Sequence, residues 1–247
     1  MSFRFYPYLS TNITNTKSTL SYQPFNLGQL NLAPYLPQLK KQPQLELFTV
    51  YKSLTSFLNN RGFNSFEGYS QQIPEQVTDL ISLTNKPNIN VLEIGFNAGH
   101  SAEVFLQNNK ELTLTSFDLG EHDYVSTAKE YIDVTYPNRH TLILGDSRKT
   151  IPTYLENNKN TKFDIIFIDG GHDYEIAKAD MDNCYFLAHK DTIVILDDTM
   201  FTKGWEREYT IGPTRTWMEH LQQNKIVELN KIDYINGRGM SWGKYIL

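Results

Sequence analysis

The sequence predicts an α/β fold: a doubly wound sheet of five parallel strands, extended by a C-terminal antiparallel hairpin and covered by helices on both faces. Short apolar segments alternate with helix-length segments, which is typical of parallel strands joined by right-handed crossovers. Each short segment is apolar on both faces, as a strand covered on both sides requires. Two later strand-like segments flank a short glycine-rich link, which favours antiparallel neighbours.

The predicted elements follow from runs of similar residues. Strands are expected where six or seven residues are rich in Ile, Val, Leu, Phe or Thr, at 90–95, 112–118, 140–145, 163–169 and 192–197. Helices are expected between them, at 99–109, 123–136, 147–157 and 174–188. Apolar spacing predicts two helices upstream and one downstream, at 43–60, 74–83 and 213–223. The hairpin strands are expected at 226–234 and 240–247, joined by Asn236-Gly237-Arg238-Gly239.

Composition narrows the class of protein. A chain of 247 residues with a net charge of −5 can bury a core of its own, and its pI near 5.7 argues against a basic nucleic-acid surface. Cys184 is the single cysteine, so neither an intramolecular disulfide nor a cysteine zinc site can form. No apolar run reaches about 18 residues, so no membrane span is expected. The N-terminus lacks the apolar stretch of a signal peptide, and a cytoplasmic location is expected.

The chain divides into three predicted parts. Residues 1–45 form an irregular N-terminal arm, residues 46–89 carry N-terminal helices, and residues 90–247 form the core. The arm contains no acid and is rich in proline and aromatic residues, so we expect it to pack on its own domain or on a partner subunit. A partly ordered tail is the alternative.

The carboxyl ends of the strands are where an open α/β sheet binds its ligand. The first strand leads into a turn with Gly95 and Gly99, which allow close approach of a ligand to the backbone. Asp118 closes the second strand, where an acid can accept hydrogen bonds from both hydroxyls of a ribose. The pattern indicates a nucleoside-containing ligand. The alternative is that the glycines serve turn geometry alone.

The run Glu93-x-Gly95-x-x-x-Gly99 resembles motif I of the class I S-adenosylmethionine-dependent methyltransferases, which have a Rossmann-like fold. The resemblance extends over about residues 90–247. It implies S-adenosylmethionine as cofactor, with its ribose at Asp118 and its adenine near Asp146 and Ser147. The cofactor-binding residues implied by the resemblance are Glu93, Gly95, Phe96, Asn97, Ala98, Gly99, Ser101, Asp118, Asp146, Ser147 and Asp169, with a looser match at Tyr69 and Ser70.

The segment 167–174 (FIDGGHDY), followed by Asp197-Asp198, resembles the small O-methyltransferases, both the metal-dependent catechol-type enzymes and the sugar- and antibiotic-tailoring enzymes. By this resemblance Asp169, Asp197 and Asp198 hold one divalent cation. Converging carboxylates repel one another without a cation, and hard oxygen ligands suit Mg²⁺, with Ca²⁺ and Mn²⁺ as alternatives. Catechol-type enzymes carry Asp-Asn where this chain has Asp197-Asp198, which favours a resemblance to the sugar-tailoring enzymes. The alternative is that some of these acids cap helices or bind the cofactor.

His172 lies where the catechol-type enzymes place a basic residue, so it is the predicted base, with Asp169 beside it as the second catalytic residue. Asp173 is the second choice for the base, and His172 could instead orient a metal-bound water or contact the cofactor. The implied reaction moves a methyl group to a hydroxyl of a small molecule or glycan. A homodimer is also open, because small metal-dependent methyltransferases often dimerise. No nucleic-acid or membrane partner is expected.

Two other functions were compared with this one. A nicotinamide-dependent oxidoreductase shares the ribose acid, but the glycine spacing differs and such sheets usually end in a parallel strand. A degenerate methyltransferase fold could serve as a binding or assembly module, with the aromatic arm as its docking segment. The acids at the strand ends argue against that reading, because a fold freed from catalysis need not keep them.

Overall fold

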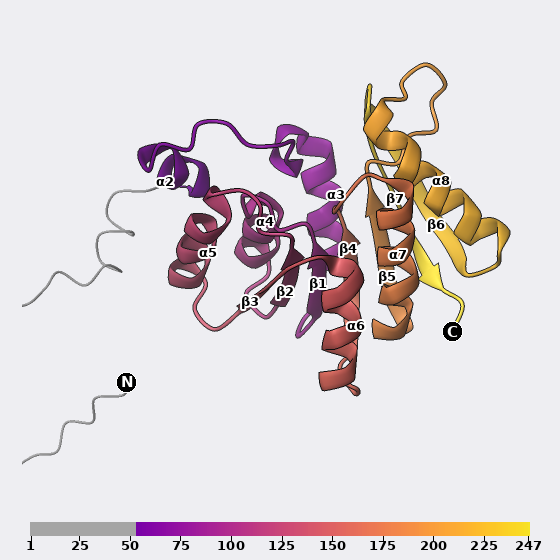
Figure 1. Cartoon of the computed structure of the whole chain (residues 1–247), viewed down its shortest axis with the longest axis horizontal. Coiled ribbons are helices and arrows are strands. Elements are labelled where there is room, and N and C mark those ends of the chain that lie inside the picture. Colours follow the sequence, from indigo (N-terminus) through magenta and orange to yellow (C-terminus); the bar gives the residue numbers. More distant parts are fainter. Residues whose placement is uncertain (1–52) are drawn as a thin grey trace, which may run out of the picture. The chain divides into compact units, whose positions relative to one another are not determined.

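The computed structural model describes residues 53–247, so the predicted arm (1–45) and the first part of the helix predicted at 43–60 lie outside the described residues. The described residues contain a seven-stranded mixed sheet in the order β3-β2-β1-β4-β5-β7-β6 (Figure 1). Its strands are β1 (Asn90–Ile94), β2 (Thr113–Asp118), β3 (His140–Leu144), β4 (Phe163–Ile168), β5 (Ala188–Asp197), β6 (Ile226–Ile235) and β7 (Arg238–Tyr245).

The first five strands are parallel, and β7 pairs antiparallel with both β5 and β6. The chain starts in the middle of the sheet at β1, winds outward through β2 and β3, and returns to β4 on the other side of β1. The strand order therefore reverses between β1 and β4, which is where a doubly wound sheet opens a crevice. The predicted α/β fold, with its parallel sheet and antiparallel C-terminal hairpin, is confirmed.

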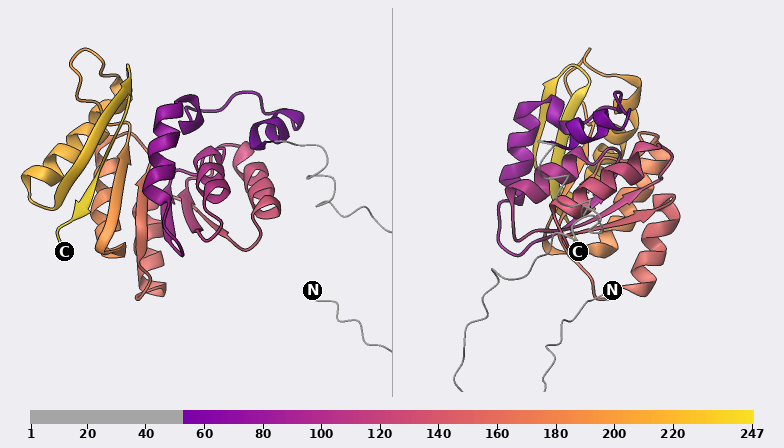
Figure 2. Two further views of the ribbon diagram at one scale, coloured as in Figure 1. Left: turned by 180° about the vertical axis from the view of Figure 1, so that it is seen from behind. Right: turned by 90° about the vertical axis from the view of Figure 1, so that its left-hand side faces the viewer.

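Two apolar clusters cover the faces of the sheet, and neighbouring strand residues alternate between them. Val91 and Ile165 belong to the cluster under the helices α2 to α5, whereas Leu92 and Ile166 belong to the cluster under α6 to α8. Figure 2 shows these helices from behind and from the side. The helices are α2 (Leu54–Asn60), α3 (Pro74–Thr84), α4 (His100–Asn108), α5 (Tyr124–Thr135), α6 (Ser147–Asn157), α7 (Tyr174–Cys184) and α8 (Glu208–Gln222), with short 3₁₀ helices η3 (Ser70–Gln72) and η4 (Tyr185–Leu187).

The predicted boundary between the helix at 174–188 and the fifth strand was wrong. The helix α7 ends at Cys184, and β5 begins at Ala188 instead of residue 192. Ala188 pairs in register with Phe163 of β4, and the Thr192 hydroxyl donates to the Phe163 carbonyl at 2.6 Å. Pairing with the neighbouring strand thus overrides local helix propensity here.

The start of the helix predicted at 213–223 was also wrong. α8 begins at Glu208 and contains Pro213 in its interior. Proline has no backbone N–H, so the helix loses one hydrogen bond, the one from this position to the carbonyl four residues earlier. The preceding turn is held at its start, because the Arg207 N–H donates to the Thr210 hydroxyl at 3.1 Å and the Thr210 N–H donates to the Arg207 carbonyl at 2.9 Å.

Smaller differences concern the ends of the described chain. α2 begins at Leu54, after the Ser53 cap, within the helix predicted over 43–60. In the hairpin, Ile235 pairs with Arg238, so β7 begins two residues earlier than predicted and Arg238 belongs to the sheet. Across residues 53–247, none of the helices combines the length and apolar character that a membrane span requires.

Candidate active site

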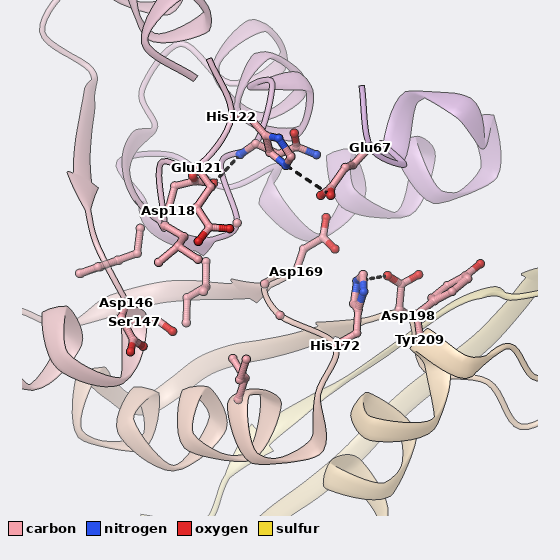
Figure 3. Close-up of a pocket in the computed structure, with 18 of the residues that line it drawn as sticks. Glu67, Asp118, Glu121, His122, Asp146, Ser147, Asp169, His172, Asp198 and Tyr209 are labelled. Carbon is pink, nitrogen blue, oxygen red and sulfur yellow. Dashed lines mark hydrogen bonds and ion pairs between the residues drawn. The ribbon is translucent and has the colours of Figure 1, made fainter. Parts of the chain in front are cut away.

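A cavity of about 870 Å³ opens at the carboxyl ends of the parallel strands, at the point where the strand order reverses. Figure 3 shows its side chains converging from loops that follow β2, β3, β4 and β5. The predicted site residues that line it are Gly95, Asn97, Asp118, Asp146, Ser147, Asp169, His172 and Asp198. The fold therefore brings eight predicted residues from five strand ends to one cavity.

The loop after β1 is pressed against the loop after β4. Gly95 has a φ of +95°, and a Cβ placed on it would lie 1.9 Å from the carbonyl oxygen of Asp169. The Asp169 N–H donates to the Ile94 carbonyl at 2.8 Å, which closes the two loops together. Only glycine fits this place, and it leaves backbone exposed to the cavity for a ligand to approach.

Asp118 forms the floor of one end of the cavity, which we call the nucleoside end. Its carboxylate accepts one hydrogen bond from the Asn97 N–H and another from the Gly120 N–H, each at 2.7 Å. Asn97 itself has a φ of +49°, which turns its N–H toward the carboxylate. The two backbone donors fix the carboxylate and leave further lone pairs of both oxygens for hydroxyl donors.

Asp146 and Ser147 stand beside this end of the cavity, at the start of α6. The Asp146 carboxylate accepts from the Arg148 N–H at 3.1 Å and pairs with the Arg148 guanidinium at 2.8 Å. These hydrogen bonds lower the pKa of Asp146, the side-chain bond from Arg148 being the main cause. Asp146 therefore caps its helix and keeps its charge while lining the cavity.

Three carboxylates belong to the opposite end, which we call the acceptor end: Asp169 and Asp198 line the cavity, and Asp197 is buried. Loss of contact with water raises the pKa of Asp169 well above its usual range, and the charges of Asp197 and Asp198 raise it further. The pKa of Asp197 is raised to about 7, first by burial and then by Asp198. Both oxygens of Asp197 accept from the Gln76 amide at 2.8 Å, and Asp197 does not line the cavity.

His172 faces the third carboxylate. Its Nε2 lies 2.9 Å from Oδ2 of Asp198 (Figure 3), and this hydrogen bond is the main reason that the pKa of His172 is raised. The imidazole is 44% exposed and its ring lies 5.5 Å from the ring of Tyr209. Asp169, His172 and Asp198 each bring one potential ligand atom to a group in which all atoms lie within 4.8 Å of one another. This group contains His172 in the place that the sequence assigned to Asp197.

The other predicted cofactor residues form a supporting layer outside the cavity lining. Glu93 is fully buried and accepts from the hydroxyls of Ser101 and Ser116, each at 2.5 Å. Burial raises its pKa to about 7, against the lowering effect of the two serines. The remaining residues of this layer are Phe96, Ala98, Gly99, Ser101, Tyr69 and Ser70.

Aromatic stacking holds that layer in place. The ring of Phe96 stacks on His140 at 5.0 Å, and the ring of Tyr69 stacks on His100 at 4.1 Å. Phe96, Ala98 and Gly99 belong to the glycine turn itself, and the predicted contact of all six residues with a cofactor stays a prediction.

Three charged or titratable residues that the sequence analysis did not single out are important in the cavity. Glu67 and His122 come from loops far apart in the chain, and their side chains lie 3.3 Å apart across the cavity (Figure 3). Arg238 reaches the acceptor end from the start of β7. No sequence pattern marks the first two, because their meeting depends on the fold. Arg238 was visible as the single charge of the glycine-rich link, but it was interpreted as a turn residue.

Comparison with known proteins agrees with this fold. A family described as "Methyltransferase domain" matches residues 92–199, and no match was found among curated protein sequences. The fold is similar to an O-methyltransferase from Bacillus cereus solved with S-adenosylhomocysteine, with a TM-score of 0.61 and 17% identity over 85% of this chain and 96% of that one. It is also similar to TomG from Streptomyces achromogenes, solved with S-adenosylmethionine (TM-score 0.60, 16% identity, 86% and 94% covered).

A third similar structure is CalS11, a TDP-rhamnose 3′-O-methyltransferase of calicheamicin biosynthesis, with a TM-score of 0.52 and 20% identity over 83% of this chain and 92% of that one. At these identities the three structures establish the fold. Together with the domain match, they confirm the resemblance drawn from the glycine turn and the acids at the strand ends. Residues 92–199 thus match a methyltransferase domain, and the described residues have the fold of the solved O-methyltransferases.

Proposed function

We propose that this protein is an S-adenosylmethionine-dependent O-methyltransferase that methylates a hydroxyl of a small molecule or sugar with the help of a divalent cation, magnesium. The observation that carries the proposal is the single cavity that joins two chemically different ends. Asp118 offers acceptors for a ribose at one end. The pair formed by His172 and Asp198 offers a proton acceptor at the other.

The nucleoside end supports binding of the methyl donor. Gly95 lets the donor approach the backbone, Asp118 accepts hydrogen bonds from the ribose hydroxyls, and Asp146 with Ser147 lies beside the adenine. S-adenosylmethionine supplies a methyl group that its sulfonium already activates. The protein therefore has to hold the acceptor oxygen close to that methyl group and in line with the bond that breaks.

The acceptor end supports removal of the hydroxyl proton. With Nε2–H of His172 donating to Asp198, the lone pair of Nδ1 is free to take a proton from the acceptor. Asp198 stabilises the imidazolium that forms, because its carboxylate lies at 2.9 Å from the ring nitrogen. The aromatic ring of Tyr209 lines the cavity beside His172, and the acceptor can pack against it.

The donor set at this end fits a divalent cation. Asp169 and Asp198 offer carboxylate oxygens that lie, with a nitrogen of His172, within 4.8 Å of one another, and Oδ1 of Asp198 is buried without a hydrogen-bond partner among the described residues. The two carboxylates would hold the cation and leave His172 as the base. The pKa of Asp169 is raised because burial and the neighbouring charges of Asp197 and Asp198 disfavour its carboxylate, and a cation would compensate that charge. A bound cation would lower the pKa of the acceptor hydroxyl. The cytoplasmic location and a homodimeric assembly stay predictions from the sequence.

Two measurements test the proposal. Titration calorimetry should show binding of S-adenosylhomocysteine, and the absence of binding at high micromolar concentration would exclude the donor assignment. Transfer of a radioactive methyl group to a library of sugars, nucleotide sugars and phenols should identify an acceptor. EDTA should abolish that transfer and Mg²⁺ should restore it, whereas full activity in EDTA would remove the cation from the proposal.

A further inference from the structure

Arg238 places a permanent positive charge beside the carboxylates of the acceptor end. Its side chain is 16% exposed, and its Nε lies 3.7 Å from Oδ1 of Asp198. Its Nη1 lies 3.5 Å from the amide oxygen of Gln72, and the residue lines the cavity. A buried guanidinium stays charged under all ordinary conditions, so it contributes to the charge balance of this end whatever else binds there.

The hairpin fixes the position of this guanidinium. Arg238 follows the turn at Gly237, whose carbonyl accepts a hydrogen bond from the Tyr209 hydroxyl at 2.6 Å. A Cβ on Gly68 would lie 2.8 Å from Nη1 of Arg238, so glycine there leaves room for the guanidinium. Contacts from α8, from the hairpin and from the segment before η3 therefore define one place for the charge.

Asp198 divides its two oxygens between His172 and Arg238. Oδ2 meets His172 at 2.9 Å, a hydrogen-bond distance, whereas Oδ1 meets Arg238 at 3.7 Å. Both Oδ1 and Nε of Arg238 are buried without a hydrogen-bond partner among the described residues. Arg238 thus balances the charge of Oδ1 without using its hydrogen-bonding capacity, and this oxygen remains able to take a closer ligand.

We propose that Arg238 is the internal counter-cation of the acceptor end and competes with a divalent cation for Asp198, so that this arginine sets the cation affinity of the site. The inference rests on the proposed function, because it concerns the cation assigned there. A cation bound at Asp198 and the guanidinium of Arg238 would repel each other across a poorly solvated space. The native chain therefore binds the cation more weakly than its carboxylates alone would.

The test measures binding of Mn²⁺, without donor or acceptor, by electron paramagnetic resonance of the free ion. Arg238→Met keeps most of the side-chain volume and removes the charge, and it should tighten Mn²⁺ binding about tenfold or more. Arg238→Lys keeps the charge and should stay near the native value. Arg148→Met is the matched control, because Arg148 pairs with Asp146 at the nucleoside end of the same cavity and should leave Mn²⁺ binding unchanged.

Unchanged or weaker Mn²⁺ binding by Arg238→Met overturns the proposal, and so does the absence of Mn²⁺ binding in both the native protein and the variant. If Arg238→Met does not fold, Arg238→Gln decides by the same criterion, because it keeps a polar side chain and removes the charge. Adding Asp198→Asn to Arg238→Met should abolish the tightened Mn²⁺ binding, which would show that the ion binds at Asp198. S-adenosylhomocysteine binding by the same proteins is measured separately, so a failure of the donor assignment is distinguishable from a failure of this inference.

Discussion

The two ends of the cavity hold their carboxylates in different ways. At the nucleoside end, two backbone N–H groups donate to the Asp118 carboxylate. The Asp146 carboxylate accepts from the backbone N–H of Arg148 at the start of α6 and pairs with the Arg148 guanidinium. At the acceptor end, Asp198 is met by the His172 side chain and Asp197 by the Gln76 side chain, and the charges of both carboxylates raise the pKa of Asp169.

This difference separates two kinds of chemistry. A carboxylate fixed by backbone donors is pre-organised to accept hydrogen bonds from neutral hydroxyls. Carboxylates that repel one another respond to an incoming proton or cation, which is what proton removal from an acceptor requires. The nucleoside end is thus suited to binding hydroxyl groups, and the acceptor end is suited to exchanging a proton or a cation.

The largest expected effect comes from removing the proposed base. His172→Ala should lower kcat by about 10²- to 10⁴-fold, the range that general bases contribute. The affinity for S-adenosylhomocysteine should change little, because His172 belongs to the acceptor end. Steady-state kinetics and calorimetry on the same preparation separate the two quantities. A variant that keeps its kcat, or that loses donor binding to the same degree, would contradict the division of the cavity.

The contact between the loop after β1 and the loop after β4 can be broken at Gly95. Gly95→Ala places a Cβ 1.9 Å from the Asp169 carbonyl oxygen at a φ of +95°. Gly62→Ala is the matched control, since Gly62 has a φ of +92° but no atom within 4 Å of its Cβ position. The control should lose about 1–2 kcal/mol for backbone strain alone, and Gly95→Ala should lose at least about 2 kcal/mol more for the collision.

Urea unfolding measures both variants, and calorimetry with S-adenosylhomocysteine shows whether donor binding falls with them. Equal loss of stability in the two variants would mean that the loops after β1 and β4 separate freely. In that case the contact at Gly95 does not hold the ends of the cavity together.

Asp118 allows the nucleoside end to be tested alone. Asp118→Ala should weaken binding of S-adenosylhomocysteine about 100-fold, because hydrogen bonds to a charged acceptor are worth about 1.5–3 kcal/mol each. Asp118→Asn keeps one carbonyl oxygen and should lose less. Binding of Mn²⁺ at the acceptor end should be the same in both variants. Calorimetry that shows native affinity in Asp118→Ala would remove the ribose from this position.

The sequence predicted those features that depend on local order along one strand and its following loop. Gly95 and Asp118 could be assigned because a strand end, a glycine and an acid lie within a few residues of the place where they act. The parallel sheet followed from the same regular alternation. Pairing between strands was harder to foresee, as the start of β5 shows: Phe163 of another strand decides that Ala188 is extended.

Features that depend on side chains meeting across the fold could not be predicted. Asp197 was grouped with Asp198 because the pair matches the acids that follow the fifth strand in the small O-methyltransferases, but successive residues leave a strand end in different directions. Asp197 turns to Gln76 of α3, 121 residues away, while Asp198, at a φ of +54°, turns to His172. The role of Arg238 depends equally on long-range contacts, because its neighbours come from three separate segments.

The smallest expected effect concerns Glu93, which lies beneath the glycine turn of the nucleoside end. Its pKa rises from 4.5 to about 7 on folding, so between these values the folded state binds more protons than the unfolded state. Stability should therefore fall as the pH rises, by about 2 kcal/mol between pH 5 and pH 7 for this group alone. Glu93→Gln removes that contribution, and its stability relative to the native protein should rise with pH. Urea unfolding at several pH values measures the difference, with the exposed Glu111→Gln as control. Parallel curves for Glu93→Gln and the native protein would show that this carboxyl folds with its charge.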